Sequence, residues 1–344
     1  MILVIGGTGS VGVYAIEHLV AKGYEVLATG SNSLAKERLA QLGVETVNLR
    51  MENVADFDKL PTEGIEAVVV LGALLPANNP KNQSAPDYVK DYLEVITIGM
   101  VNVLEYCRRN GISKVIKTTS HFDLMKSWAR GVALLEDAPR NFPFTGDHAP
   151  YVIANNAAVE VMEYYNQQYG FKTCVFRLAT VYGVGSHGSL FVDGTVKKSG
   201  IQTFVENASQ GLPIELWGDV DLSRDLVYVK DVAQAIEKAI ASPNAVGVYT
   251  IASGVAVTLE QQIKTIIQVF SDPKQPSTII YRPEKTTHEP SNLYSIEKAR
   301  RDFGYAPEYS DYEAMMVDYK RELESGRFQE YFGDRALQSS VPAT

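Results

Sequence analysis

Near its start the chain reads Ile2-Leu3-Val4-Ile5-Gly6-Gly7-Thr8-Gly9-Ser10-Val11-Gly12, and this stretch decides the fold. The apolar run predicts a short buried strand, and the residues from Val11 to Lys22 repeat with the period of a helix. A tight turn from strand to helix needs glycines, and so does the close approach of backbone N–H groups to a pyrophosphate. Because the glycines follow a strand and open a helix, the stretch predicts a dinucleotide-binding β-α-β unit.

Strand and helix patterns go on alternating beyond this loop. Further strands are predicted over residues 25–29, 44–49, 67–71, 114–119 and 172–178, and helices over 34–42, 88–109 and 151–169. Parallel strands need crossover connections, which these helices supply. We therefore expect an α/β fold: a Rossmann-type doubly wound parallel sheet with helices on both faces.

The pattern loosens after Tyr182, which suggests a second lobe interleaved with the first. We expect residues 1–182 and about 225–257 to form the dinucleotide-binding domain. The helix 231–241 and the strand 248–251 would return to its sheet. Residues 183–224 and 258–330 would form a smaller, C-terminal substrate lobe, and 331–344 a loose tail.

The composition argues against several classes of function. The chain has 344 residues, a formal net charge of −9 and no block of Lys and Arg, which argues against binding to nucleic acid or to an anionic membrane. We find no targeting segment and no apolar stretch long enough to span a bilayer, so we expect a cytoplasmic protein. The two cysteines, Cys107 and Cys174, are predicted to be reduced core thiols, and no metal site is expected.

The end of the second strand bears on the choice of cofactor. An Asp or Glu there would bind the adenosine ribose and select NAD, but the chain reads Thr29-Gly30-Ser31-Asn32-Ser33. The absence of a carboxylate permits the 2′-phosphate of NADP, which we favour over NAD. Ser31, Asn32 and Ser33 could donate to that phosphate. Lys36 and Arg38 would either add charge or form a solvated helix face.

Four later stretches carry a resemblance to a known family. They are Lys117-Thr118-Thr119-Ser120, Pro150-Tyr151-Val152-Ile153-Ala154-Asn155, Arg177-Leu178-Ala179-Thr180-Val181-Tyr182-Gly183 and Arg224-Asp225-Leu226-Val227-Tyr228-Val229-Lys230-Asp231. With them the chain resembles the extended short-chain dehydrogenase/reductases, the NAD(P)-dependent epimerase/dehydratase family. Residues 204–231 and 282–307 look similar to its nucleotide-sugar members.

The resemblance implies a catalytic set. In the family a Tyr takes or gives the substrate proton, a Ser or Thr orients the same oxygen, and a Lys four residues after the Tyr lowers its pKa. The matching residues are Tyr151 and Ser120, but Asn155 stands at the Lys position. Only about one free Tyr in a thousand is ionised at pH 7. Asn155 can bind a ribose hydroxyl but brings no charge, which predicts slow chemistry, reductive chemistry or binding without turnover. Lys117 and His148 are close in sequence, although the sequence places neither in the site.

The same resemblance implies the binding residues. Those expected at the cofactor are Gly6, Gly9, Ser10, Val11, Gly12, Gly30, Ser31, Asn32, Asn48, Leu49, Gly72, Ala73, Tyr151 and Asn155. Those expected at the substrate are Ser120, Thr180, Arg224 and Arg282, where an arginine fork suits a diphosphate. It also implies a homodimer built by two helices from each subunit.

Three functions stay open. The first is an enzyme that acts on a nucleotide-sugar-like substrate, as an epimerase that oxidises and re-reduces a ring carbon. A dehydratase would need an extra acid/base pair after Ser120, where the chain has His121-Phe122-Asp123. The second is an NADPH-dependent carbonyl reductase of a small ketone or aldehyde, which needs no sugar diphosphate. The third is a dinucleotide-binding regulatory protein without turnover.

Overall fold

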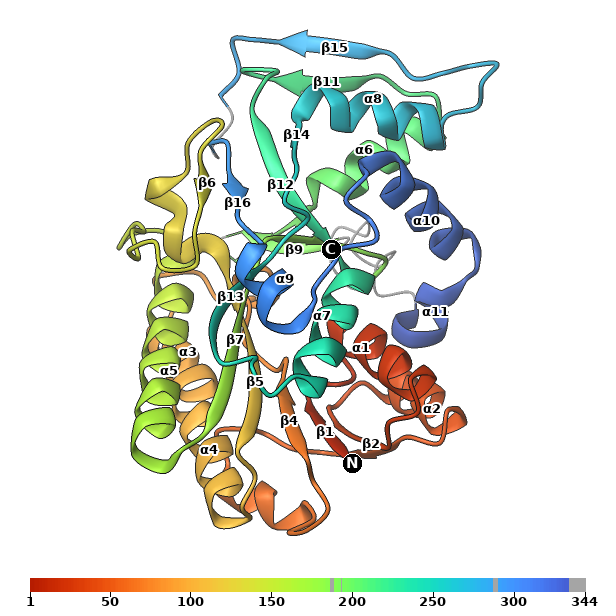
Figure 1. Ribbon diagram of the computed structural model, residues 1–344. Helices are drawn as coiled ribbons and strands as arrows, with labels where there is room; N and C mark the ends of the chain where they lie inside the picture. Colours follow the sequence, from red (N-terminus) through yellow and green to blue (C-terminus); the bar gives the residue numbers. More distant parts are fainter. Residues whose placement is uncertain (186–188, 193, 287–289, 334–344) are drawn as a thin grey trace.

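A computed structural model describes residues 1–185, 189–192, 194–286 and 290–333 (Figure 1). Its centre is a seven-stranded sheet in the order β13-β7-β5-β4-β1-β2-β3, and every neighbouring pair is parallel. The strands are β1 (Ile2–Ile5), β2 (Val26–Thr29), β3 (Glu45–Val47), β4 (Ala67–Val70), β5 (Lys114–Ser120), β7 (Lys172–Leu178) and β13 (Gly247–Ile251). The predicted doubly wound parallel sheet is confirmed.

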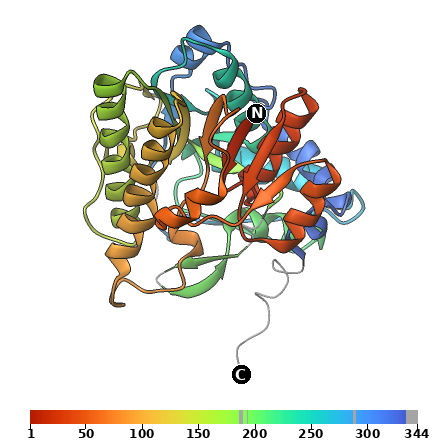
Figure 2. The same ribbon diagram turned by 90° about the horizontal axis from the view of Figure 1, so that it is seen from below.

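Helices cover both faces of this sheet (Figures 1 and 2). One face carries α1 (Ser10–Ala21), α2 (Ser33–Gln41) and α7 (Val229–Ala241). The other carries α3 (Tyr88–Tyr92), α4 (Gly99–Arg109) and α5 (His148–Tyr169). Each layer buries its own apolar cluster, because the strands are apolar on both sides. From β1 the chain adds β2 and β3 on one side, and β4 then pairs with the other side of β1. Sheets of this kind bind ligands at the point between β1 and β4 where the strand order reverses.

Element boundaries differ from the sequence prediction in three places. The third strand covers only Glu45–Val47, and α5 begins at His148 instead of residue 151. The predicted helix 88–109 is continuous, but Leu93–Ile98 forms a π-helical stretch between α3 and α4. Such stretches widen a helix locally.

Most of the remaining elements pack above the carboxyl ends of the strands in the view of Figure 1, while the helix Glu297–Phe303 packs against β13. They form small sheets and helices: β8 (Thr180–Tyr182) with β12 (Ser223–Tyr228) and β14 (Ala256–Thr258), β11 (Ile214–Trp217) with β15 (Ile279–Arg282), β9 (Ser189–Val192) with β10 (Thr195–Lys198), β6 (Ala133–Leu134) with β16 (Leu293–Tyr294), and α6 (Gly200–Ser209), α8 (Leu259–Phe270) and α9 (Glu297–Phe303). No helix in the described ranges is long and apolar enough to cross a bilayer.

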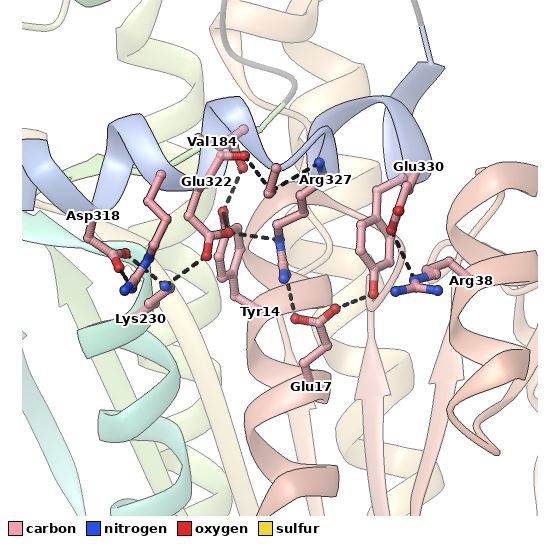
Figure 3. A network of polar contacts seen from close by, with 12 residues as sticks. Tyr14, Glu17, Arg38, Val184, Lys230, Asp318, Glu322, Arg327 and Glu330 are labelled. Carbon is pink, nitrogen blue, oxygen red and sulfur yellow. Dashed lines mark hydrogen bonds and ion pairs between the residues drawn. The ribbon is translucent and has the colours of Figure 1, made fainter. Parts of the chain in front are cut away.

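Two C-terminal helices, α10 (Tyr312–Glu324) and α11 (Arg327–Phe332), fold back onto α1 and α2 (Figure 3). Arg327 bridges Glu17 of α1 at 2.5 Å and Glu322 of α10 at 3.2 Å. The buried Tyr331 donates its hydroxyl to Glu17. The first part of the segment predicted as a tail is therefore packed helix, and residues 334–344 of that prediction lie outside the described residues.

Candidate active site

The glycine loop brings three strand ends close together. A Cβ on Gly6 would lie 2.5 Å from the backbone N of Gly72, and one on Gly12 would lie 2.5 Å from the carbonyl oxygen of Gly6. A Cβ on Gly30 would overlap the hydroxyl of Thr8. The predicted cofactor residues Gly6, Gly12, Gly30 and Gly72 are thus gathered where β1, β2 and β4 end, and at the first three of them no larger side chain fits.

The start of α1 suits a phosphate. Gly9 is its N-cap, and among the described residues no side chain caps the helix. The helix dipole favours an anion at the first-turn N–H groups, which include those of Val11 and Gly12. The bare cradle and the uncapped N-terminus fit a dinucleotide pyrophosphate.

The residues after β2 divide into two groups. Asn32 caps α2 by accepting from the Ala35 N–H and donates to the Tyr331 carbonyl oxygen at 2.8 Å. Arg38 pairs with Glu330 of α11 at 3.2 Å. Both side chains are thus engaged in structural contacts. Lys36 instead hydrogen-bonds the Asn48 side chain, at the predicted adenosine position.

The predicted catalytic residues come together. Ser120 at the end of β5 and Tyr151 and Asn155 on α5 line one pocket, whose lining is Thr119, Ser120, Asp123, Arg140, Tyr151, Val152, Asn155, Asn156, Val159, Val175, Arg177 and Val248. Tyr151 and Asn155 share a face because they are one helical turn apart. Ser120 accepts the N–H of Phe122 at 3.4 Å and so begins the next turn of chain.

Tyr151 is a buried phenol. Only 7% of its surface is exposed, and its ring packs edge-on to Tyr92 with centroids 6.4 Å apart. Burial raises the pKa of Tyr151 well above its usual value, and the neighbouring Asn155 amide offsets this rise only in part. The Asn155 Nδ2 donates to the Tyr151 carbonyl oxygen at 3.0 Å, while its buried Oδ1 has no partner among the described residues. This orphaned acceptor suits a ribose hydroxyl.

The structure adds a buried ion pair to the pocket that sequence reasoning missed. Arg177 Nη2 lies 2.9 Å from Asp123 Oδ2, and both residues are almost fully buried. The chain after Ser120 forms a 3₁₀ helix, His121–Ser127, in which residues three apart align. Asp123 therefore lines the same pocket as Ser120, and the spacing of three was the signal. Burial raises the pKa of Asp123 more than the Arg177 charge lowers it.

The predicted substrate residues are spread out. Thr180 lies on β8 and Arg224 on the adjacent strand β12. Burial lowers the pKa of His121, next to Ser120, to about 3, with Arg224 and Arg177 adding to the effect. Arg224 itself is not among the residues that line the described pocket. Arg282 lies on the outer strand β15 and pairs with Glu215 at 3.2 Å. Neither Thr180 nor Arg282 belongs to the described pocket lining.

Comparison with known proteins agrees with this geometry. The model of the NAD dependent epimerase/dehydratase family matches residues 2–252. The chain belongs to this family. Its members include extended short-chain dehydrogenase/reductases, so the chain is an enzyme of this type that binds a nicotinamide dinucleotide.

Individual relatives are distant. A Methanocaldococcus jannaschii protein, provisionally named a UDP-glucose 4-epimerase, is 26% identical over 68% of this chain and 72% of its own. A dTDP-4-dehydro-6-deoxy-D-allose reductase of Streptomyces is 23% identical over 89% of this chain and 91% of its own. The structure of UDP-glucose 4-epimerase from Thermotoga maritima with UDP-glucose superposes with a TM-score of 0.75, at 22% identity, over 94% of this chain and 99% of that one. This last likeness concerns the fold.

Proposed function

We propose that this family member is a nucleotide-sugar epimerase that uses Tyr151 as its acid/base. The observation that carries the proposal is one pocket lined by Ser120, Tyr151 and Asn155, beside a glycine cradle at the carboxyl ends of the strands. UDP-glucose epimerases among the relatives and fold neighbours support the substrate class.

The chain's own residues have separate tasks in this proposal. The Tyr151 phenolate accepts the proton of a sugar hydroxyl when that carbon is oxidised, and the resulting phenol returns the proton on re-reduction. The Ser120 hydroxyl holds the same sugar oxygen, and Asn155 accepts from the ribose of the dinucleotide. The nicotinamide, when bound, accepts and returns the hydride. Arg224 on β12 is our candidate for the sugar diphosphate, together with Thr180 on the neighbouring strand β8, where Thr180 is aligned with Leu226.

Turnover without added cofactor tests this proposal. The purified protein is incubated with UDP-glucose, UDP-N-acetylglucosamine or dTDP-glucose, and the sugar products are separated. We expect the epimer of one of them to accumulate with no net change in nicotinamide absorbance. Mass spectrometry of the protein, native and then denatured, reports any dinucleotide that copurifies. A protein that binds dinucleotide but converts none of these sugars would favour the regulatory reading instead.

A carbonyl reductase is the second candidate, favoured by the state of Tyr151. Its raised pKa keeps the phenol protonated, which is the form that donates a proton to a carbonyl. A reductase would consume one NADPH for each ketone reduced. Loss of NADPH absorbance with a 4-keto sugar nucleotide, without epimerisation of the parent sugar, would favour this reading.

The cofactor proposal is NADP, and Lys36 is the residue that tests it. Its ammonium lies beside Asn48, so a 2′-phosphate on the adenosine would be within its reach. We expect Lys36→Ala to weaken NADPH binding about tenfold, the value of one charge-assisted hydrogen bond, and to leave NADH binding unchanged. Arg38→Ala is the matched control, because Arg38 pairs with Glu330. Equal losses for both cofactors in Lys36→Ala would contradict NADP selection.

We also propose a homodimer across α3–α4 and α5. These helices lie side by side on one face (Figure 2) and leave five apolar side chains exposed: Val89, Ile98, Ile153, Tyr164 and Tyr169. A second copy of the same surface would cover them, in the arrangement of a four-helix bundle. Sedimentation of the purified chain as two copies is expected, and sedimentation as one copy would overturn the proposal.

A further inference from the structure

Strand β5 contains a buried lysine that has no carboxylate partner among the described residues. Lys117 is 1% exposed, and among the described residues its ammonium has one hydrogen bond, to the Thr118 carbonyl oxygen at 3.4 Å. No ion pair within the described ranges includes it. Burying an unpaired ammonium is costly, so lysine is rarely found in such a place. Burial accordingly lowers the pKa of Lys117 to about 8, and the charged form still predominates at pH 7.

The register of the sheet places Lys117 beneath the catalytic helix. Lys117 is aligned with Val70 of β4 and Val175 of β7, which belong to the apolar cluster under α3, α4 and α5. Side chains alternate along a strand, so Thr119 is on the same face as Lys117. Val175 and Thr119 line the pocket together with Tyr151 and Asn155. The neighbours of Lys117 on two sides therefore contact the site.

We propose, on the basis of the proposed function, that Lys117 on β5 supplies the positive charge that α5 lacks because Asn155 is neutral. The two tasks that one lysine performs in the family pattern are then divided. Asn155 keeps the hydrogen bond to the ribose, and Lys117 stabilises the phenolate form of Tyr151.

The other titratable groups at this pocket are neutral, acidic or already paired. Arg140 lines the pocket but pairs with Glu160 at 2.5 Å. Tyr92 of α3 and Cys107 of α4 are neutral when protonated, and burial raises the pKa of Cys107 to about 12. Asp123 at the pocket is a carboxylate, whose charge opposes a phenolate, and Arg177 is paired to it.

A charge-relocation experiment tests the proposal. Lys117→Met should lower kcat about tenfold or more and leave KM for the sugar nucleotide nearly unchanged, because the charge acts on the acid/base group. Adding Asn155→Lys to that variant returns a cation to the site and should restore kcat. The pH profile of kcat should move up in Lys117→Met and return in the double variant. Lys114→Met is the control: that buried lysine on β5 bonds the carbonyl oxygens of Ser242 and Ala245.

A second measurement needs no turnover. The protein is labelled with ¹³C-lysine, and the Lys117 resonance is assigned by its loss in Lys117→Met. In Asn155→Lys a second ammonium stands close to the first, so the Lys117 pKa should fall by about one unit or more. An unchanged Lys117 titration in Asn155→Lys would overturn the proposal, and so would wild-type kcat in Lys117→Met. If the wild-type protein converts no sugar nucleotide, the proposed function fails, and the titration still decides the placement of the charge.

Discussion

Tyr151→Phe is expected to lower kcat by about 10²–10⁴-fold, the usual contribution of a positioned acid/base group. The ring fills the same buried space between α5 and Tyr92, so the fold and dinucleotide binding should be retained. The measurement is kcat for the converted nucleotide sugar, with binding of the reduced cofactor followed by its fluorescence.

Tyr92→Phe is the matched control for this substitution. Tyr92 is also fully buried, and its hydroxyl accepts a hydrogen bond from Asn79 Nδ2 at 3.2 Å, away from the pocket lining. Its loss should change kcat only a few-fold. If Tyr151→Phe turned over at the rate of Tyr92→Phe, another group would be the acid/base.

Arg177→Met is expected to lower the free energy of unfolding by about 3–5 kcal/mol. The substitution keeps the volume of the side chain but leaves the Asp123 carboxylate buried without its cation. Denaturant unfolding, monitored by circular dichroism, measures the change. The loss should shrink as pH falls, because protonation of Asp123 removes the uncompensated charge, and its raised pKa brings that protonation to a higher pH than for a free aspartate.

Arg140→Met is the control that distinguishes the loss of the buried ion pair from the loss of an arginine elsewhere in the same pocket. Arg140 also lines the pocket, but its partner Glu160 is largely exposed to solvent. Such a pair contributes about 0–1 kcal/mol. Arg177→Met combined with Asp123→Asn should recover part of the stability, since the orphaned charge is gone. Equal losses in the two arginine variants would show that Asp123 needs no counter-charge.

Local patterns predicted the framework of the fold. The glycine loop and the alternating apolar strands determine their own structure over a few residues, so the sheet followed from them. Ser120, Tyr151 and Asn155 came from the family resemblance, and the three residues line one pocket. Asp123 was missed because its place depends on a 3₁₀ turn, for which no signal was weighed.

The remaining features could not be predicted because they depend on contacts between segments that are far apart in the sequence. Asn32 was predicted to contact a phosphate, yet its side chain donates a hydrogen bond to the carbonyl oxygen of Tyr331, 299 residues away in the chain. The same limit applied to Lys117, which was known to be close in sequence but could be oriented only from the sheet register. Contacts of this kind depend on how complete elements pack, and no window of sequence contains both partners.

The packing of α11 against α1 also determines when this contact can form during synthesis of the chain. Tyr331 and its partner Glu17 are 314 positions apart, so a growing chain on the ribosome displays α1 long before its partner is made. Translation proceeds at about 5–20 residues per second, so roughly fifteen seconds to a minute separate the synthesis of Glu17 from that of Tyr331. Until then α1 lacks the contacts that α11 makes with it, although α7 can already pack on it. The contacts between α11 and α1 therefore form late in the folding of this chain.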